Sequence, residues 1–141
     1  MARYMIDTNI LYYMMDEKDC LTKDVSSVVF DIENILYASA ESVKELIVAH
    51  RRKNLLAHKC KTPDDLVKAI KKDYRVTILP VDINVVHRMA KLQINEAEDH
   101  NDPSDHIIIA HAITLGMPLI SSDRKFPFYR GQGLELISNF K

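Results

Sequence analysis

The stretch DPSDHIIIAHAITLGMPLISSD, residues 102–123, has the signals of a helix followed by a buried strand that leads to a carboxylate. Asp102 is suited to cap the start of a helix, and Pro103 to occupy its first position. Gly116 is suited to end the helix, because glycine adopts the left-handed conformation found there. A short apolar segment follows, and Asp123 comes just after it. The stretch therefore predicts a helix–strand unit with an acidic side chain at the end of the strand.

The same alternation of short apolar strands and helices extends over the whole chain. It predicts an α/β fold, a three-layer α/β/α sandwich with a short, mostly parallel sheet of four to five strands. Neither an internal repeat nor a linker divides the chain, so a single domain over residues 1–141 is expected. The expected strands cover residues 3–7, 35–38, 76–79, 118–121 and 134–137. The expected helices cover residues 8–15, 25–32, 42–52, 82–92 and 102–116, and a further one begins at Thr62.

Composition excludes several classes of protein. Apolar residues make up 47% of the 141 and charged residues 28%, which is incompatible with a disordered chain. No apolar run approaches the roughly 20 residues of a membrane-spanning helix. The two cysteines, Cys20 and Cys60, lie far apart and form no metal-binding pair. A reduced, cytoplasmic protein is therefore expected.

The net charge of −1 conceals an uneven distribution. Residues 44–75 contain ten Lys/Arg and four Asp/Glu, a local charge of +6, and the remainder carries −7. A basic segment on an acidic body attracts nucleic acid, although lysines such as Lys71 can equally serve only to solvate a helix. Three consecutive residues are the candidate contacts to a nucleic-acid backbone: Arg51, Arg52 and Lys53.

Four carboxylates are expected to meet at one edge of the sheet. Asp7 follows the first strand and Asp123 the fourth, and the carboxyl ends of parallel strands share an edge. Asp105 lies in the first turn of the helix that leads into the fourth strand, and Glu45 in the helix after the second. Taken singly, each acid except Asp7 also has an ordinary explanation as a cap, a turn residue or a solvated side chain. Together they would repel one another unless divalent cations neutralise them, which favours Mg²⁺ or Mn²⁺ and phosphodiester hydrolysis.

Four motifs carry a resemblance to a known family. They are MIDTNIL at residues 5–11, ASAESVKEL at 38–46, HNDPSDHIIIA at 100–110 and PLISSD at 118–123. In their order and spacing they resemble the PIN-domain ribonucleases, particularly the VapC-like toxins of bacterial and archaeal toxin–antitoxin pairs. The resemblance extends from residue 3 to about residue 138.

This resemblance implies a PIN-like fold and a set of site residues. The catalytic and metal-binding acids would be Asp7, Glu45, Asp105 and Asp123, supported by Thr8, Asn9, Asp102 and Ser121. Three positions depart from the family pattern, because Ser104 replaces a Phe, His106 an Arg and His111 a Gln. The four acids are retained, so metal binding is expected, and the departures fall at positions expected to affect contacts to substrate and partner.

The resemblance also implies an activity and partners. The chain would be a Mg²⁺- or Mn²⁺-dependent endoribonuclease with an RNA substrate, a homodimer, and the partner of an antitoxin protein whose helical tail lies in an apolar groove. Tyr12, Leu55 and Leu56 are the preferred anchors of that tail, because they lie near the ends of expected helices. The complete set of candidate anchors is Leu11, Tyr12, Leu46, Ile47, Leu55, Leu56, Leu66 and Ile70.

Other functions fit the sequence less well. A phosphatase of the haloacid-dehalogenase type needs a second Asp two residues after the first, where this chain has Asn9. A receiver domain needs an acid pair after the first strand, which is also missing. A PIN-like module that binds RNA or protein without cutting stays open as the alternative, although such a module has no need of four mutually repelling carboxylates.

Overall fold

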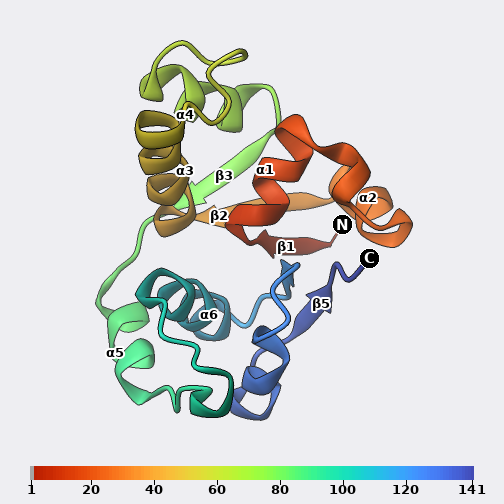
Figure 1. Cartoon of the computed structure of the whole chain (residues 1–141). Helices are drawn as coiled ribbons and strands as arrows, with labels where there is room; N and C mark the ends of the chain where they lie inside the picture. Colours follow the sequence, from red (N-terminus) through yellow and green to blue (C-terminus); the bar gives the residue numbers. More distant parts are fainter. Residues whose placement is uncertain (1) are drawn as a thin grey trace.

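The computed structural model describes residues 2–141, which form a five-stranded, entirely parallel sheet (Figure 1). The strand order is β3-β2-β1-β4-β5, so the chain builds outward from β1 to β3 and then continues on the other side of β1. This arrangement confirms the expected parallel α/β architecture. The strands are β1 (Arg3–Ile6), β2 (Ile35–Ser39), β3 (Val76–Leu79), β4 (Leu119–Ser121) and β5 (Leu136–Ser138).

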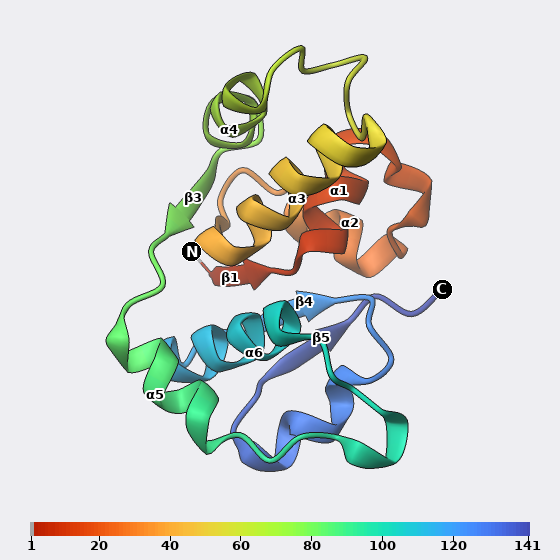
Figure 2. The ribbon, with the colours of Figure 1, turned by 60° about the vertical axis from the view of Figure 1, so that its left-hand side comes forward.

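Helices cover both faces of the sheet and complete the three layers. Figures 1 and 2 show α1 to α4 on one side of the sheet, and α5 and α6 on the other. The helices are α1 (Thr8–Asp16), α2 (Lys23–Val29), α3 (Ala40–Lys53), α4 (Pro63–Lys72), α5 (Ile83–Lys91) and α6 (Pro103–Leu115). Short 3₁₀ helices span Lys18–Cys20, Glu96–Glu98 and Phe126–Gln132.

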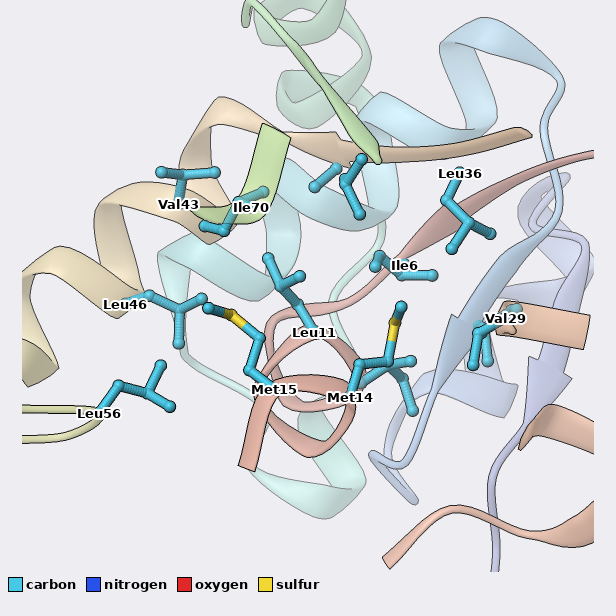
Figure 3. Close-up of a cluster of buried hydrophobic side chains, with 14 of the residues drawn as sticks. Ile6, Leu11, Met14, Met15, Val29, Leu36, Val43, Leu46, Leu56 and Ile70 are labelled. Atoms are coloured by element: carbon cyan, nitrogen blue, oxygen red, sulfur yellow. The ribbon is translucent and has the colours of Figure 1, made fainter. Parts of the chain in front are cut away.

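A hydrophobic cluster lies on each face of the sheet. Successive side chains of a strand point to opposite faces, so Ile6 joins the cluster under α1–α4 and Met5 the cluster under α6. Because both faces are buried, the central strands are mostly apolar. Figure 3 shows the first cluster, which includes Leu11, Met14, Met15, Leu46, Leu56 and Ile70.

The strongest local signals coincide with the observed helix ends. At the start of α4, Thr62 and Asp65 form a reciprocal capping box. At the start of α6, the side chain of Asp102 accepts a hydrogen bond from the Ser104 N–H. Gly116 ends α6 with φ +60°, a conformation that costs a glycine little.

Several expected boundaries differ from the structure, by up to three residues. The helix expected over 25–32 ends at Val29, because the turn after it has its own hydrogen bonds: Asn34 donates to the Val28 carbonyl, and Asp31 accepts from the Glu33 N–H. The last strand begins at Leu136 rather than residue 134, because the first residue of β4, Leu119, pairs with Leu136.

The expected set of partner anchors was largely wrong. Five of its eight residues are core residues, each at most 2% exposed: Leu11, Leu46, Leu56, Leu66 and Ile70. Leu56 is buried because the segment after α3 folds back on the core, where the His50 ring bonds to the Cys60 carbonyl at 2.7 Å. Tyr12, Ile47 and Leu55 are only partly buried and stay available as anchors.

Within residues 2–141, no helix combines the length and the apolar character needed to cross a membrane.

Candidate metal centre

The strand order reverses between β1 and β4, and ligands of parallel sheets bind at such a reversal, outside the carboxyl ends of the strands. Asp7 directly follows β1, and Asp123 follows β4 after one intervening residue. Glu45 on α3 and Asp105 at the start of α6 lie near enough for their charges to raise the pKa of Asp7. The fold thus brings the four expected carboxylates to one edge of the sheet.

Asp7 is held at the bottom of this site. Its side chain is 3% exposed. One carboxylate oxygen accepts from the Thr8 N–H at 2.7 Å, which caps α1, and the other accepts from the Ser121 hydroxyl at 2.7 Å. Burial raises the pKa of Asp7 from 3.8 to about 7, and the charges of Asp105 and Glu45 add to the rise.

Helices α3 and α6 contribute a group of three carboxylates. Glu45, Asp102 and Asp105 each offer an oxygen atom, and these atoms all lie within 4.8 Å of one another. The Thr8 hydroxyl donates to Glu45 Oε1 at 2.5 Å and fixes that side chain against the start of α1. Burial is the main cause that raises the pKa of Glu45, and the charge of Asp102 adds to it.

Asp105 also belongs to a second group, with Asp123 and His100. One ligand atom from each lies within 4.8 Å of the other two. Asp123 is fixed by its own turn, in which its backbone N–H donates to the Ser121 hydroxyl and its side chain accepts from the Lys125 N–H. Burial raises the pKa of Asp105 to about 8, and the charges of Asp102, Asp123 and Glu45 contribute.

The donor set fits a hard divalent cation. Oxygens on one octahedral Mg²⁺ are about 3 Å apart when adjacent and about 4.2 Å apart when opposite, so oxygens within 4.8 Å of one another would draw together by up to about 2 Å when the cation binds. Carboxylates that resist ionisation when alone ionise readily beside a cation, because it removes their mutual repulsion. Residues 2–141 therefore contain a preformed cluster of oxygen ligands of the kind that Mg²⁺ and Mn²⁺ use.

Comparison with known proteins identifies the family. The PIN domain family profile matches residues 4–131, most of the chain. The chain belongs to the PIN domain family. Among curated proteins, none matches this PIN domain by sequence.

Solved structures share the fold at low identity. VapBC2 from Rickettsia felis, bound to a DNA fragment from its promoter, has 19% identity and a TM-score of 0.67 over 96% of this chain and 98% of its own. VapBC-1 from nontypeable Haemophilus influenzae has 23% identity and a TM-score of 0.66 over 99% of both chains. VapBC-5 from Mycobacterium tuberculosis, a member of the VapBC family of toxin–antitoxin systems, has 22% identity and a TM-score of 0.61 over 98% of this chain and 99% of its own. At these identities the similarity is one of fold.

The side chains expected to support the acids divide into two sets. Thr8, Ser121 and Asp102 lie within the PIN domain's acidic site, the first two as hydrogen-bond donors to Glu45 and Asp7. Asn9 is exposed on the first turn of α1, and none of the hydrogen bonds formed within residues 2–141 involves its side chain. No hydrogen bond within the described residues therefore accounts for the supporting role expected of Asn9.

Two residues of the site had no role assigned from the sequence. His100 is 2% exposed, and its Nε2 lies 2.9 Å from Asp105 Oδ2. Burial is the main cause that lowers the pKa of His100. Glu41 accepts from the Ser104 hydroxyl at 2.6 Å and pairs with Lys44 at 2.5 Å. The only sequence signal for His100 was its position two residues before the Asp102 cap.

Each of the three residues that depart from the family pattern forms a hydrogen bond. Ser104 joins the start of α6 to Glu41 on α3. His106 bonds through Nε2 to the His100 carbonyl at 2.8 Å, and His111 bonds through Nδ1 to the Ser39 hydroxyl at 2.9 Å. These positions therefore tie the start of α6 and the end of β2 to their neighbours, and the acids keep their places.

An open pocket runs along α3 beside the acids. It is lined by Lys44, Glu45, Val48, Ala49, Arg52, Lys53 and Ser104. Of the three expected nucleic-acid contacts, the pocket contains Arg52 and Lys53, whereas Arg51 is exposed elsewhere on the helix. Together with Lys44, these residues place three positive side chains in a pocket that also contains Glu45 of the acidic site.

Proposed function

We propose that this PIN domain is a divalent-metal-dependent endoribonuclease and the toxin of a toxin–antitoxin pair. The observation that carries the proposal is the cluster of carboxylates at the β1–β4 reversal, where burial raises the pKa of Asp7 to about 7 and that of Asp105 to about 8. Burial and mutual repulsion make such a cluster costly to stability, which supports a bound cation as the reason to keep it.

The proposed metal ligands are the four acids predicted from the sequence: Asp7, Glu45, Asp105 and Asp123. A bound Mg²⁺ or Mn²⁺ would supply activation of water and stabilisation of the negative charge that develops on the phosphate and the leaving oxygen. Thr8 and Ser121 keep Glu45 and Asp7 oriented through their hydroxyl groups. Asp102, at the rim, adds a negative charge beside Asp105 and strengthens the attraction for a cation.

Incubation with a long single-stranded RNA and Mn²⁺ tests this function. Internal cleavage by the wild-type chain is the expected result, with Asp105→Asn purified in parallel as the control for contaminating ribonucleases. RNA binding without cleavage would instead support a non-catalytic binding module.

The pocket along α3 is the proposed path of the RNA backbone. Replacing both Arg52 and Lys53 by Ala is expected to weaken RNA binding and to reduce the slope of log affinity against log salt by about 1 to 2, at roughly 0.7 per phosphate contact. Arg51→Ala is the matched control, because Arg51 lies outside the pocket. Equal losses in the double variant and the control would assign these charges to general solvation.

The toxin role is supported by the fold it shares with VapBC proteins. An antitoxin with a helical tail is the proposed inhibitor, and a homodimer the proposed assembly. Tyr12, Ile47 and Leu55 are the remaining candidate anchors for that tail. The proposed location is the cytoplasm, in keeping with free thiols at Cys20 and Cys60.

A further inference from the structure

A buried chain of hydrogen bonds leads from the protein interior to Asp105. The backbone N–H of Asn95 donates to the Tyr129 hydroxyl at 3.1 Å. That hydroxyl lies 2.9 Å from His100 Nδ1, and His100 Nε2 lies 2.9 Å from Asp105 Oδ2. Tyr129 is fully buried and His100 is 2% exposed, so water does not compete for these bonds.

The state of Asp105 defines the tautomer of His100. A carboxylate that binds a cation is ionised and can only accept, so the facing nitrogen, Nε2, carries the ring proton and donates to Asp105 Oδ2. Burial favours the neutral ring, which leaves Nδ1 as the acceptor nitrogen. The Tyr129 hydroxyl accepts the Asn95 N–H and has its own proton to donate to Nδ1.

The ring of His100 has little freedom to turn. The rings of His106, Tyr129 and Phe126 surround it, with centroids 5.0, 5.5 and 5.7 Å away. His106 also bonds to the backbone carbonyl of His100. A donor held this firmly fixes the direction from which Asp105 Oδ2 is bound.

We propose that His100 is a positioning residue for Asp105: held by the Tyr129 hydroxyl, it donates through Nε2 to one carboxylate oxygen and orients the carboxylate toward the cation. This inference rests on the proposed function, in which Asp105 is a metal ligand. It assigns His100 to the support of a ligand, because the Nε2 proton blocks that nitrogen from binding metal.

Two replacements of His100 separate positioning from other roles. His100→Gln keeps an N–H donor on a side chain of similar length, and is expected to retain Mn²⁺ affinity and kcat within about threefold, whereas His100→Leu is expected to lose about 10- to 100-fold. Tyr129→Phe removes the hydroxyl that donates to Nδ1, and its loss is expected to fall between those of the two His100 variants. KM for RNA is expected to stay the same in all three, because His100 lies beneath the carboxylates.

Mn²⁺ binding is measured by calorimetry, and kcat and KM by RNA cleavage. His111→Leu is the matched control, since it removes a buried histidine that bonds to Ser39 and not to a carboxylate, and it is expected to bind Mn²⁺ as the wild type does. Wild-type Mn²⁺ affinity in His100→Leu would overturn the proposal. So would an equal loss in His100→Gln, which would mean that the imidazole itself is required, for instance as a ligand.

The test is independent of the proposed activity. A wild-type chain that binds Mn²⁺ but leaves RNA intact contradicts the proposed ribonuclease, while the affinities of the His100 variants still decide the role of His100. If His100→Leu does not fold, the test is made with His100→Gln and Tyr129→Phe instead. Near-wild-type affinity in the first with a loss in the second supports positioning, and the reverse order overturns it.

Discussion

Asp105→Asn is expected to abolish RNA cleavage. Asp105 belongs to both groups of ligand atoms, so its loss weakens every arrangement in which these side chains hold a cation. The loss of several kcal/mol of transition-state stabilisation corresponds to a decrease in kcat of at least about 10³-fold, at 1.36 kcal/mol per tenfold. The measurement is the rate of RNA cleavage at saturating Mn²⁺.

Asp64→Asn is the matched control for this variant. Asp64 is an exposed acid at the start of α4 that pairs with Lys68, and it contributes to neither group of ligand atoms. It is expected to cleave RNA at the wild-type rate. Above pH 8, the thermal midpoint of metal-free Asp105→Asn should equal or exceed that of the wild type, because the substitution then removes a buried, repelling charge. Cleavage by Asp105→Asn within tenfold of the wild-type rate would contradict the assignment of this residue.

The metal-free protein is expected to lose stability as the pH rises from about 4 to about 8. Burial raises the pKa of Asp7 from 3.8 to about 7, so the folded state binds a proton there more tightly than the unfolded state does. Stability conferred by that proton is complete below pH 4 and is lost as the pH passes 7. A rise of about three pKa units corresponds to roughly 4 kcal/mol, at 1.36 kcal/mol per unit, before any relaxation of the site.

Comparison with Asp7→Asn isolates this effect from the other titrating groups. Asn cannot ionise, so the stability of the wild type relative to Asp7→Asn should fall between pH 5 and pH 8 by about 2 to 3 kcal/mol, the part of the change that lies above pH 5. The measurement is urea unfolding in EDTA at each pH. Excess Mn²⁺ at pH 8 should restore much of the wild-type stability, because it binds only the folded state. A difference that stays constant from pH 5 to pH 8 would mean that Asp7 ionises normally.

The parallel sheet and the convergence of the acids were predictable because both follow from local signals and one topological rule. Asp102, Pro103 and Gly116 set the ends of α6, and side chains after parallel strands lie on one edge of the sheet. The roles of the acids stay proposals, but their proximity follows from where the strands end. The positions of Asp7 and Asp123 could be predicted from the strand ends alone, without knowledge of the loops.

The predictions that were wrong or missing concern loops and contacts between residues that are distant in sequence. Leu56 is close to the end of α3, where an exposed side chain is reasonable, but the backbone turns into a left-handed conformation at φ +62° and the side chain enters the core. His100 bonds to Tyr129, 29 residues further along the chain. Neither contact has a sequence period or a capping motif, so only the folded chain reveals it.

Removal and restoration of metal in an RNA cleavage assay tests most directly whether the acidic cluster acts through a divalent cation. The account predicts that wild-type cleavage stops in excess EDTA, returns when Mn²⁺ or Mg²⁺ is added beyond the chelator, and does not return for Asp105→Asn under the same conditions. Cleavage by the wild-type chain that continues undiminished in excess EDTA would contradict it.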